Sequence, residues 1–252
     1  MLGTGASVNN YKGSYWEKIR DNYSVGINYW ALHDFVPNYL MLEFIGNHDS
    51  LLDNVLMRRC SEFSKCNIVI KGNYLNSNNY KFINSRLNKI PDSLKKNMYL
   101  SKDFPIPGDN YTDFKKSVYL LHKLGFFGKK KKIDYLAQSR GTLIAAIIMG
   151  IKLGFKKIVL CGVDLNNCSN FYMSDYDYYK NKGYPLPSLE EFKNRENPSL
   201  RHWTDRDNHN IIKVSDSVKV MEEFFRKNFD VKIYVGSKES NLLPKVPQFK
   251  WN

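Results

Sequence analysis

The chain has 252 residues, of which 42% are hydrophobic and 14% aromatic, so it can build a sizeable core and a disordered chain is excluded. Its formal charge of +13 favours anionic partners such as nucleic acid, acidic phospholipid or phosphorylated small molecules, although an AT-rich genome also enriches Lys, Asn, Tyr and Ile. No apolar run approaches the ~20 residues of a membrane span, and the start of the chain lacks a signal peptide, so a cytoplasmic location is expected.

The first motif is a Gly-x-Gly-x-Ser turn made by Gly3, Gly5 and Ser7. Such a turn suits the close approach of backbone to a phosphate, followed by a capped helix. Only Met1 and Leu2 stand before it, so the first strand is either very short or has lost residues. A short helix over 15–21 and a strand over 24–29 follow. Asn28, at the end of that strand, has an amide that can both donate to and accept from a base or sugar hydroxyl.

The next third of the chain reads as strands separated by helices. A strand is predicted over 40–45, with Asn47 just after it, then a helix over 51–65 and a buried strand over 66–71. The segment 73–108 is rich in Asn and has no long periodicity, so it is interpreted as a variable connection with one short helix. A helix over 111–124 then ends at a glycine.

The most informative stretch is SRGTLIAAIIMGIKLGFKKIVLCGVD, from Ser139 to Asp164. Apolar and small residues over 142–153 predict a buried helix ended by Gly154, and the run 158–161 predicts a buried parallel strand. Helix, turn, strand and Gly-x-Asp are typical of a doubly wound, mostly parallel α/β sheet, in which ligands bind at the carboxyl ends of the strands. Asp164 is therefore a candidate site residue. The alternative is that Asp164 only caps the following turn.

Residues from about 166 to 210 are polar and aromatic without periodicity, which predicts a lid inserted into a single α/β domain spanning 1–252. A helix over 214–227, opened by Ser215 and Asp216, and a strand over 231–235 complete the domain. The run Lys129–Lys132 is read as a solvated turn, or alternatively as a phosphate or membrane contact. The four cysteines have neither metal-site spacing nor the density of a disulfide scaffold and are expected to be reduced.

Polar groups at several strand ends favour a nucleotide site, and their convergence is more informative than any single motif. They are Gly3, Gly5, Ser7, Asn28, Asn47 and Asp164. Two Asp-x-Asp triplets, Asp175-Tyr176-Asp177 and Asp205-Arg206-Asp207, match a motif found in metal-dependent glycosyltransferases. Both lie in the polar lid, where such triplets arise by chance, so no metal ligand and no cofactor is predicted.

The chain resembles the bacterial sialyltransferases of glycosyltransferase family 42, which use CMP-activated sialic acid. The resemblance is carried by GTGAS near the start, by GINYW around Asn28, by the stretch Ser139–Asp164 and by SDSVKVMEEFFRKNFDVKIYV. It covers most of the chain, but only the central stretch is specific. It implies a Rossmann-like, GT-A-like fold and an inverting, metal-independent transfer of sialic acid or a related keto-sugar acid from CMP to a surface glycan.

The resemblance also implies roles for individual residues. Gly5 and Ser7 would face the CMP phosphate, Asn28 and Asn47 the cytidine and sugar, and Ser139, Gly141 and Thr142 the donor's sugar or ribose. His209 is the nearest match to the family's general base, with His202 as the alternative because the spacing before Ser215-Asp216 is longer by three residues. Where the family has two phosphate-binding tyrosines, this chain has Asn166 at the first place and Tyr172 near the second.

Two other functions compete with a transferase. An S-adenosylmethionine-dependent methyltransferase also uses a Gly-x-Gly turn, but it normally has an acidic residue where this chain has Asn28. A basic nucleic-acid-binding protein would fit the charge, yet no binding motif is present and the positive residues are scattered, so no nucleic acid is predicted. The expected partners are a CMP-activated sugar acid, a glycan or glycolipid acceptor and, by peripheral contact, an anionic membrane surface. Formation of a homo-oligomer is left open.

Overall fold

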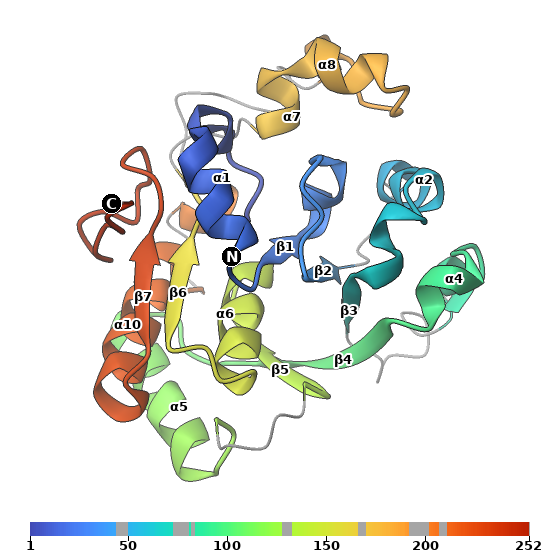
Figure 1. Ribbon diagram of the computed structural model, residues 1–252. Coiled ribbons are helices and arrows are strands. Elements are labelled where there is room, and N and C mark those ends of the chain that lie inside the picture. Colours follow the sequence, from blue (N-terminus) through green and yellow to red (C-terminus); the bar gives the residue numbers. More distant parts are fainter. Residues whose placement is uncertain are drawn as a thin grey trace.

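The computed structural model describes residues 1–43, 50–72, 81, 84–127, 133–165, 170–191, 202–206 and 211–251. The described chain is an α/β fold of the Rossmann type (Figure 1). Its strands are β1 (Val25–Ile27), β2 (Tyr39–Glu43), β3 (Asn67–Gly72), β4 (Met98–Pro105), β5 (Tyr135–Gln138), β6 (Lys157–Leu160) and β7 (Lys232–Val235). Its α-helices are α1 (Gly13–Arg20), α2 (Ser50–Arg58), α4 (Asp92–Lys95), α5 (Tyr111–Lys123), α6 (Thr142–Lys152), α7 (Phe171–Ser174), α8 (Tyr176–Asn181) and α10 (Val214–Phe229). Four 3₁₀ helices are η1 (Ala6–Asn10), η2 (Asn28–Leu32), η3 (Glu62–Lys65) and η4 (Trp203–Asp205).

Leu2 joins two groups of parallel strands. One group has the order β1-β2-β3-β4-β5, the other is the pair β6-β7, and Leu2 forms parallel bridges to Gly26 on one side and Cys161 on the other. The Leu2 N–H donates to Val25 O at 2.7 Å, and the Gly3 N–H donates to Cys161 O at 2.8 Å. The expected first strand is therefore very short in this structure. The chain builds outward from it in both directions, which makes it the switch point of a doubly wound sheet.

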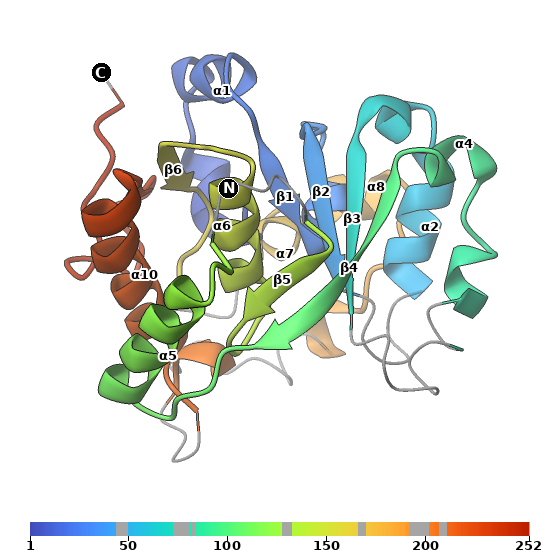
Figure 2. The same ribbon diagram turned by 90° about the horizontal axis from the view of Figure 1, so that it is seen from below.

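Alternating side chains of the strands feed two separate cores. On β2, Leu40 and Leu42 belong to one core and Met41 to the other, and β3 repeats this pattern. Helices α5, α6 and α10 cover one face of the sheet, and α1, α2 and α7 cover the opposite face, as Figures 1 and 2 show. Burial on both faces explains why β2 and β3 read as continuous apolar runs in the sequence.

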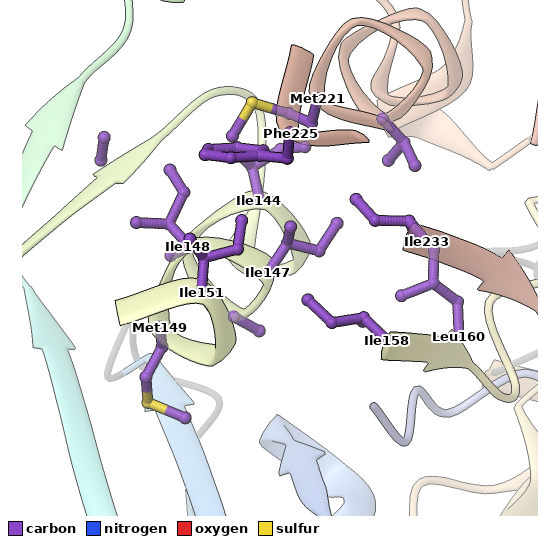
Figure 3. Packing of buried hydrophobic residues seen from close by; sticks show 14 of the residues in the cluster. Ile144, Ile147, Ile148, Met149, Ile151, Ile158, Leu160, Met221, Phe225 and Ile233 are labelled. Carbon is purple, nitrogen blue, oxygen red and sulfur yellow. The ribbon is translucent and has the colours of Figure 1, made fainter. Parts of the chain in front are cut away.

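Helix α6 is the best-buried helix of the larger core (Figure 3). It begins and ends as the sequence predicts, and Gly154 follows it with φ +89°, a value that favours glycine. Each isoleucine that it buries fully contributes about 1.5–3 kcal/mol to folding. Its isoleucines pack against α10, β6 and β7 through Met221, Phe225, Ile158, Leu160 and Ile233.

Three sequence predictions need correction. The helix predicted over 51–65 ends at Arg58, because the buried Arg59 turns away to donate to Ala31 O and His33 O at 2.6 and 2.7 Å, and η3 follows. The predicted connection over 73–108 contains β4 as well as α4, and β5 was not predicted. The N-cap of α10 is Lys213, and neither Ser215 nor Asp216 caps it.

No helix in the described ranges has both the length and the apolarity to cross a bilayer. Cys60, Cys66 and Cys161 are free thiols, as expected, while Cys168 lies outside the described residues. Burial raises the pKa of Cys66 to about 12, so this thiol stays protonated at neutral pH.

Candidate functional site

A cavity of about 370 Å³ opens at the carboxyl ends of the strands, on both sides of the switch point. Its volume lies in the range of small-molecule sites. A second cavity of about 240 Å³ lies at the amino ends of β1 and β6, and none of the predicted site residues lines it. The predicted residues that line the first cavity are Gly3, Gly5, Asn28, Gly141, Thr142, Asp164, Tyr172 and His202.

Two glycine turns pack against each other at the floor of this cavity. The Gly5 N–H donates to Gly162 O at 2.8 Å. A Cβ at Gly3 would lie 2.6 Å from Gly162 O, and one at Gly162, where φ is +65°, would lie 2.4 Å from Gly3 O. A Cβ at Gly5 would lie 2.4 Å from the Asp164 carboxylate. These positions therefore need glycine because the two backbones approach so closely.

Ser7, at the end of the first glycine turn, holds the carboxyl group of Asp164. Its buried carboxylate accepts from the Ser7 N–H at 2.9 Å and from the Ser7 hydroxyl at 2.5 Å. Burial raises the pKa of Asp164, and the two bonds from Ser7 partly oppose that rise. Ser7 does not line the cavity, so the structure does not bring its donors to a ligand phosphate. Among the described residues, the Asp164 carboxylate ties the end of β6 to η1. The alternative that it caps the following turn concerns residues 166–169, which lie outside the described residues.

Asn28 bridges two other groups of the cavity wall. It has φ +49°, and it begins η2 instead of ending β1. Its Oδ1 accepts from the Glu43 N–H at 3.0 Å, and its Nδ2 donates to Thr142 Oγ1 at 3.4 Å. The Thr142 hydroxyl also donates to the carboxylate of Glu43. The amide that was expected to read a base or sugar is thus already engaged with the protein.

The amino end of α6 faces the cavity without a side-chain cap. Its N-cap is Gly141, where φ is +133°, and this residue has no side chain that could accept from the first-turn N–H groups. A helix start of this kind favours anions through its exposed donors and the helix dipole. Arg140 precedes it with φ +41° and donates to Arg206 O at 2.8 Å. Ser139 is buried and does not line the cavity.

Backbone strain is concentrated around this cavity. Four described non-glycine residues have positive φ, and Asn28, Arg140 and Leu165 of these line it. Such conformations cost of order 1–3 kcal/mol each and cluster at active sites and ligand clamps. The strain is therefore a second reason, independent of the side chains, to choose this cavity as the candidate functional site.

The first described part of the predicted lid is packed into the core. The Phe171 N–H donates to Thr4 O at 2.8 Å, and Asn9 Nδ2 donates to Phe171 O at 3.0 Å. Tyr172 is almost fully buried, with its ring centroid 6.0 Å from that of Tyr29, and it lines the cavity. Helix α7 is thus a fixed wall of the site.

His202 lies on the wall of the cavity next to α6. Its Nδ1 is 2.7 Å from Thr204 Oγ1, and its backbone N–H donates to Leu165 O at 3.3 Å. Burial is the main cause that lowers the pKa of His202, against the opposing charge of Asp205. The imidazole is therefore neutral at pH 7, as a general base must be.

Three predicted site residues, Asn47, Asn166 and His209, lie outside the described residues. Asp205 of the second Asp-x-Asp triplet is buried, and its carboxylate accepts from the Ser215 N–H at 2.9 Å at the start of α10. Among the described residues, no group of three His, Cys, Asp or Glu side chains is arranged to hold a metal ion.

Sequence reasoning missed Glu43 and Thr204, which also line the cavity, whereas Arg140, another lining residue, lies inside the range 139–142 that the resemblance assigns to the donor's sugar or ribose. One signal was available for Glu43. It is the single charged residue in an apolar strand, and the next buried strand carries the opposite charge, Lys71, near its own end. Nothing local marked Thr204, because its place in the cavity wall depends on contacts between distant segments of the chain.

The site combines an uncapped helix start, a neutral imidazole and a carboxylate in one cavity. This arrangement suits a ligand that carries both an anionic group and hydroxyl groups. Comparisons of the chain with models of known families, with curated proteins and with solved structures find no match.

Proposed function

We propose that the protein is a glycosyltransferase that moves sialic acid, or a related keto-sugar acid such as legionaminic acid, pseudaminic acid or Kdo, from a CMP-activated donor to a glycan acceptor. The observation that carries the proposal is that one cavity at the switch point gathers the glycine turn, the start of α6, Tyr172 and His202. These parts come from distant segments of the chain and supply the groups that such a transfer needs.

The donor carries two anionic groups, a phosphate and a sugar carboxylate. Because the Ser7 donors are already taken by Asp164, the uncapped N–H groups at the start of α6 are the better site for one of them. The hydroxyl of Tyr172 is proposed to donate to the phosphate as it departs. A single phosphate on the leaving group makes a metal ion unnecessary in this proposal.

The reaction breaks the bond between the anomeric carbon and a phosphate oxygen, and the phosphate keeps the electron pair. The acceptor hydroxyl attacks from the opposite face, which inverts the anomeric configuration. The Thr204 N–H donates to His202 Nδ1 at 3.4 Å, an arrangement that places the ring proton on Nε2. The proposal requires the other tautomer, in which Nδ1–H donates to Thr204 Oγ1 at 2.7 Å and Nε2 takes the proton from the acceptor hydroxyl. His202 is thus the base among the described residues, and His209 is the alternative outside them.

We propose that transfer takes place in the cytoplasm at the inner face of the membrane. A lipid-linked glycan acceptor would be present there, and the net charge of +13 would favour an anionic lipid surface.

A thermal-shift experiment tests the nucleotide part of the proposal. CMP should raise the melting temperature with EDTA present, because a ligand that binds only the folded state stabilises it. UDP, GDP and S-adenosylhomocysteine should have little effect. Stabilisation by UDP or GDP only with Mg²⁺, without any effect of CMP, would contradict the proposal.

A pair of tyrosine variants supplies the control. Tyr172→Phe should weaken CMP binding about fivefold, the effect of losing one hydrogen bond of about 1 kcal/mol. Tyr179→Phe removes a similarly buried hydroxyl that does not line the cavity, so it should leave CMP affinity unchanged. Equal losses in the two variants would mean that Tyr172 does not contact the nucleotide.

A further inference from the structure

Five side chains form a polar row near the carboxyl edge of the sheet, one from the last residues of each strand from β2 to β5 and one from Asn28, just after β1. Lys71 Nζ lies 2.6 Å from Glu43 Oε1 and 3.5 Å from Asp103 Oδ2, and it donates to Gln138 Oε1. Gln138 Nε2 donates to Asp103 Oδ2 at 3.0 Å. Asn28 Oδ1 completes the row by accepting from the Glu43 N–H. Glu43 and Asn28 are the members of this row that line the cavity.

Stability alone does not account for this row. The side chain of Lys71 is 0% exposed and that of Glu43 only 16% exposed. Replacing a buried ion pair by apolar residues of similar size is often neutral or stabilising, because desolvation offsets the attraction between the charges. Here two carboxylates surround one ammonium, and Asp103 Oδ1 has no hydrogen-bond partner in the described structure. A functional role explains the arrangement better, because it holds the carboxylate of Glu43 in a fixed position at the cavity.

The position of Glu43 relative to the switch point indicates what that carboxylate binds. In doubly wound nucleotide-binding sheets, an acidic residue at the end of the strand after the glycine turn accepts from the ribose hydroxyls. In this chain that place is taken by Asn28, whose neutral amide already accepts from the Glu43 N–H and donates to Thr142 Oγ1. Glu43 lies beside Asn28 at the end of the neighbouring strand, and the Thr142 hydroxyl donates to its Oε2. Glu43 therefore supplies the acidic group one strand further along.

We propose that Glu43 accepts hydrogen bonds from the vicinal ribose hydroxyls of the bound nucleotide, and that Lys71 is the positioning residue that holds its carboxylate. A carboxylate has about four lone-pair sites, so Glu43 can keep Lys71 and Thr142 and still accept from a diol. The inference rests on the proposed binding of a nucleotide in this cavity. It adds a determinant that selects a ribonucleotide over a deoxyribonucleotide.

The test compares the affinities of CMP and 2′,3′-dideoxy-CMP by isothermal titration calorimetry. The unaltered protein should bind CMP about 10- to 100-fold more tightly, as expected for a charge-assisted hydrogen-bonded pair. Glu43→Gln keeps the shape of the side chain, so it should reduce that ratio to near one and leave the dideoxy affinity little changed. Glu222→Gln, a buried glutamate on α10 paired with Arg226, is the matched control and should keep the ratio.

Lys71→Met should lower the ratio as well, because Glu43 loses the group that positions it. The double variant Glu43→Gln/Lys71→Met removes both charges and should recover stability relative to Lys71→Met without recovering the ratio. A purely structural role for Lys71 would instead change melting temperature and leave the ratio unchanged.

The outcomes separate this inference from the proposed function. Equal binding of CMP and dideoxy-CMP by the unaltered protein overturns the role of Glu43 without any variant, even if Glu43→Gln does not fold. An unchanged ratio in Glu43→Gln overturns it too, while CMP binding and the proposed function stand. If another ribonucleoside compound binds and CMP does not, the transferase proposal fails, and the ratio for that compound and its deoxy form decides on Glu43. If no ribonucleoside compound binds, both are overturned.

Discussion

Replacing Ser7 by Ala tests whether the first glycine turn holds Asp164 as an anion. The substitution removes the 2.5 Å bond from the Ser7 hydroxyl and leaves a buried carboxylate with one donor fewer. Hydrogen bonds to charged groups contribute about 1.5–3 kcal/mol, so the free energy of unfolding should fall by that amount at neutral pH. For a chain of this size, each 1 kcal/mol shifts the melting temperature by about 2–4 °C, so a decrease of roughly 3–12 °C is expected.

The pH dependence of this loss is the sharper part of the prediction. Because burial raises the pKa of Asp164 above 3.8, the folded protein binds more protons at this carboxyl than the unfolded chain, and stability falls as pH rises through the folded pKa. Loss of the Ser7 bond raises the folded pKa further. The deficit of Ser7→Ala should therefore be largest near neutral pH and shrink as pH falls toward 3.8.

Chemical denaturation at pH 7.5 and at lower pH values measures both effects. Ser240→Ala is the matched control, because the buried Ser240 hydroxyl donates to the neutral Val163 O and its loss should cost the same at every pH. A deficit of Ser7→Ala that does not vary with pH, as in Ser240→Ala, would refute the assignment of Asp164 as the bound anion.

Three further predictions concern the site and its surroundings. His202→Ala should lower kcat about 10²–10⁴-fold with little change in CMP affinity, and Thr204→Val should lower kcat by a smaller factor. If His202→Ala remains fully active while His209→Ala loses activity, the base is His209. Gly141→Ala should lower the free energy of unfolding, measured by chemical denaturation, by of order 1–3 kcal/mol because φ is +133° at this position. Gly13→Ala is the control and should leave that free energy unchanged; an equal loss in both variants would contradict the presence of backbone strain at Gly141. The protein should co-sediment with anionic vesicles at low salt and be released by high salt, each basic residue near the surface contributing roughly 1 kcal/mol, and equal binding to neutral vesicles would exclude an electrostatic contact.

The parts of the fold that sequence predicted well are those determined by local patterns. Helix α6 and strand β6 were visible because a run of apolar residues ended at Gly154 and resumed as a short β-branched segment. The convergence of Gly3, Gly5, Asn28 and Asp164 also followed from sequence, because the carboxyl ends of parallel strands meet at one edge of a sheet.

The parts that sequence missed depend on contacts between distant segments. Strand β4 exposes side chains on both faces, including Tyr99 and Leu100, so it lacks the apolar pattern by which β2 and β3 were found. The engagement of Ser7 by Asp164 and the capping of α10 by Asp205 are pairings that no local spacing encodes. For the same reason, Glu43 looked like an interior residue of a strand that was predicted to be two residues longer.

Release of CMP from CMP-activated sugar acids is the most direct measurement of the central proposal. Purified protein incubated in EDTA with CMP-sialic acid, CMP-legionaminic acid, CMP-pseudaminic acid or CMP-Kdo, each with a glycan acceptor mixture, should release CMP from at least one donor. The same reaction should form a glycoside with inverted anomeric configuration. The rate of CMP release should fall by about 10²-fold or more in the His202→Ala or the His209→Ala variant. Absence of release from all four donors, by a protein that binds S-adenosylhomocysteine but not CMP, would contradict it.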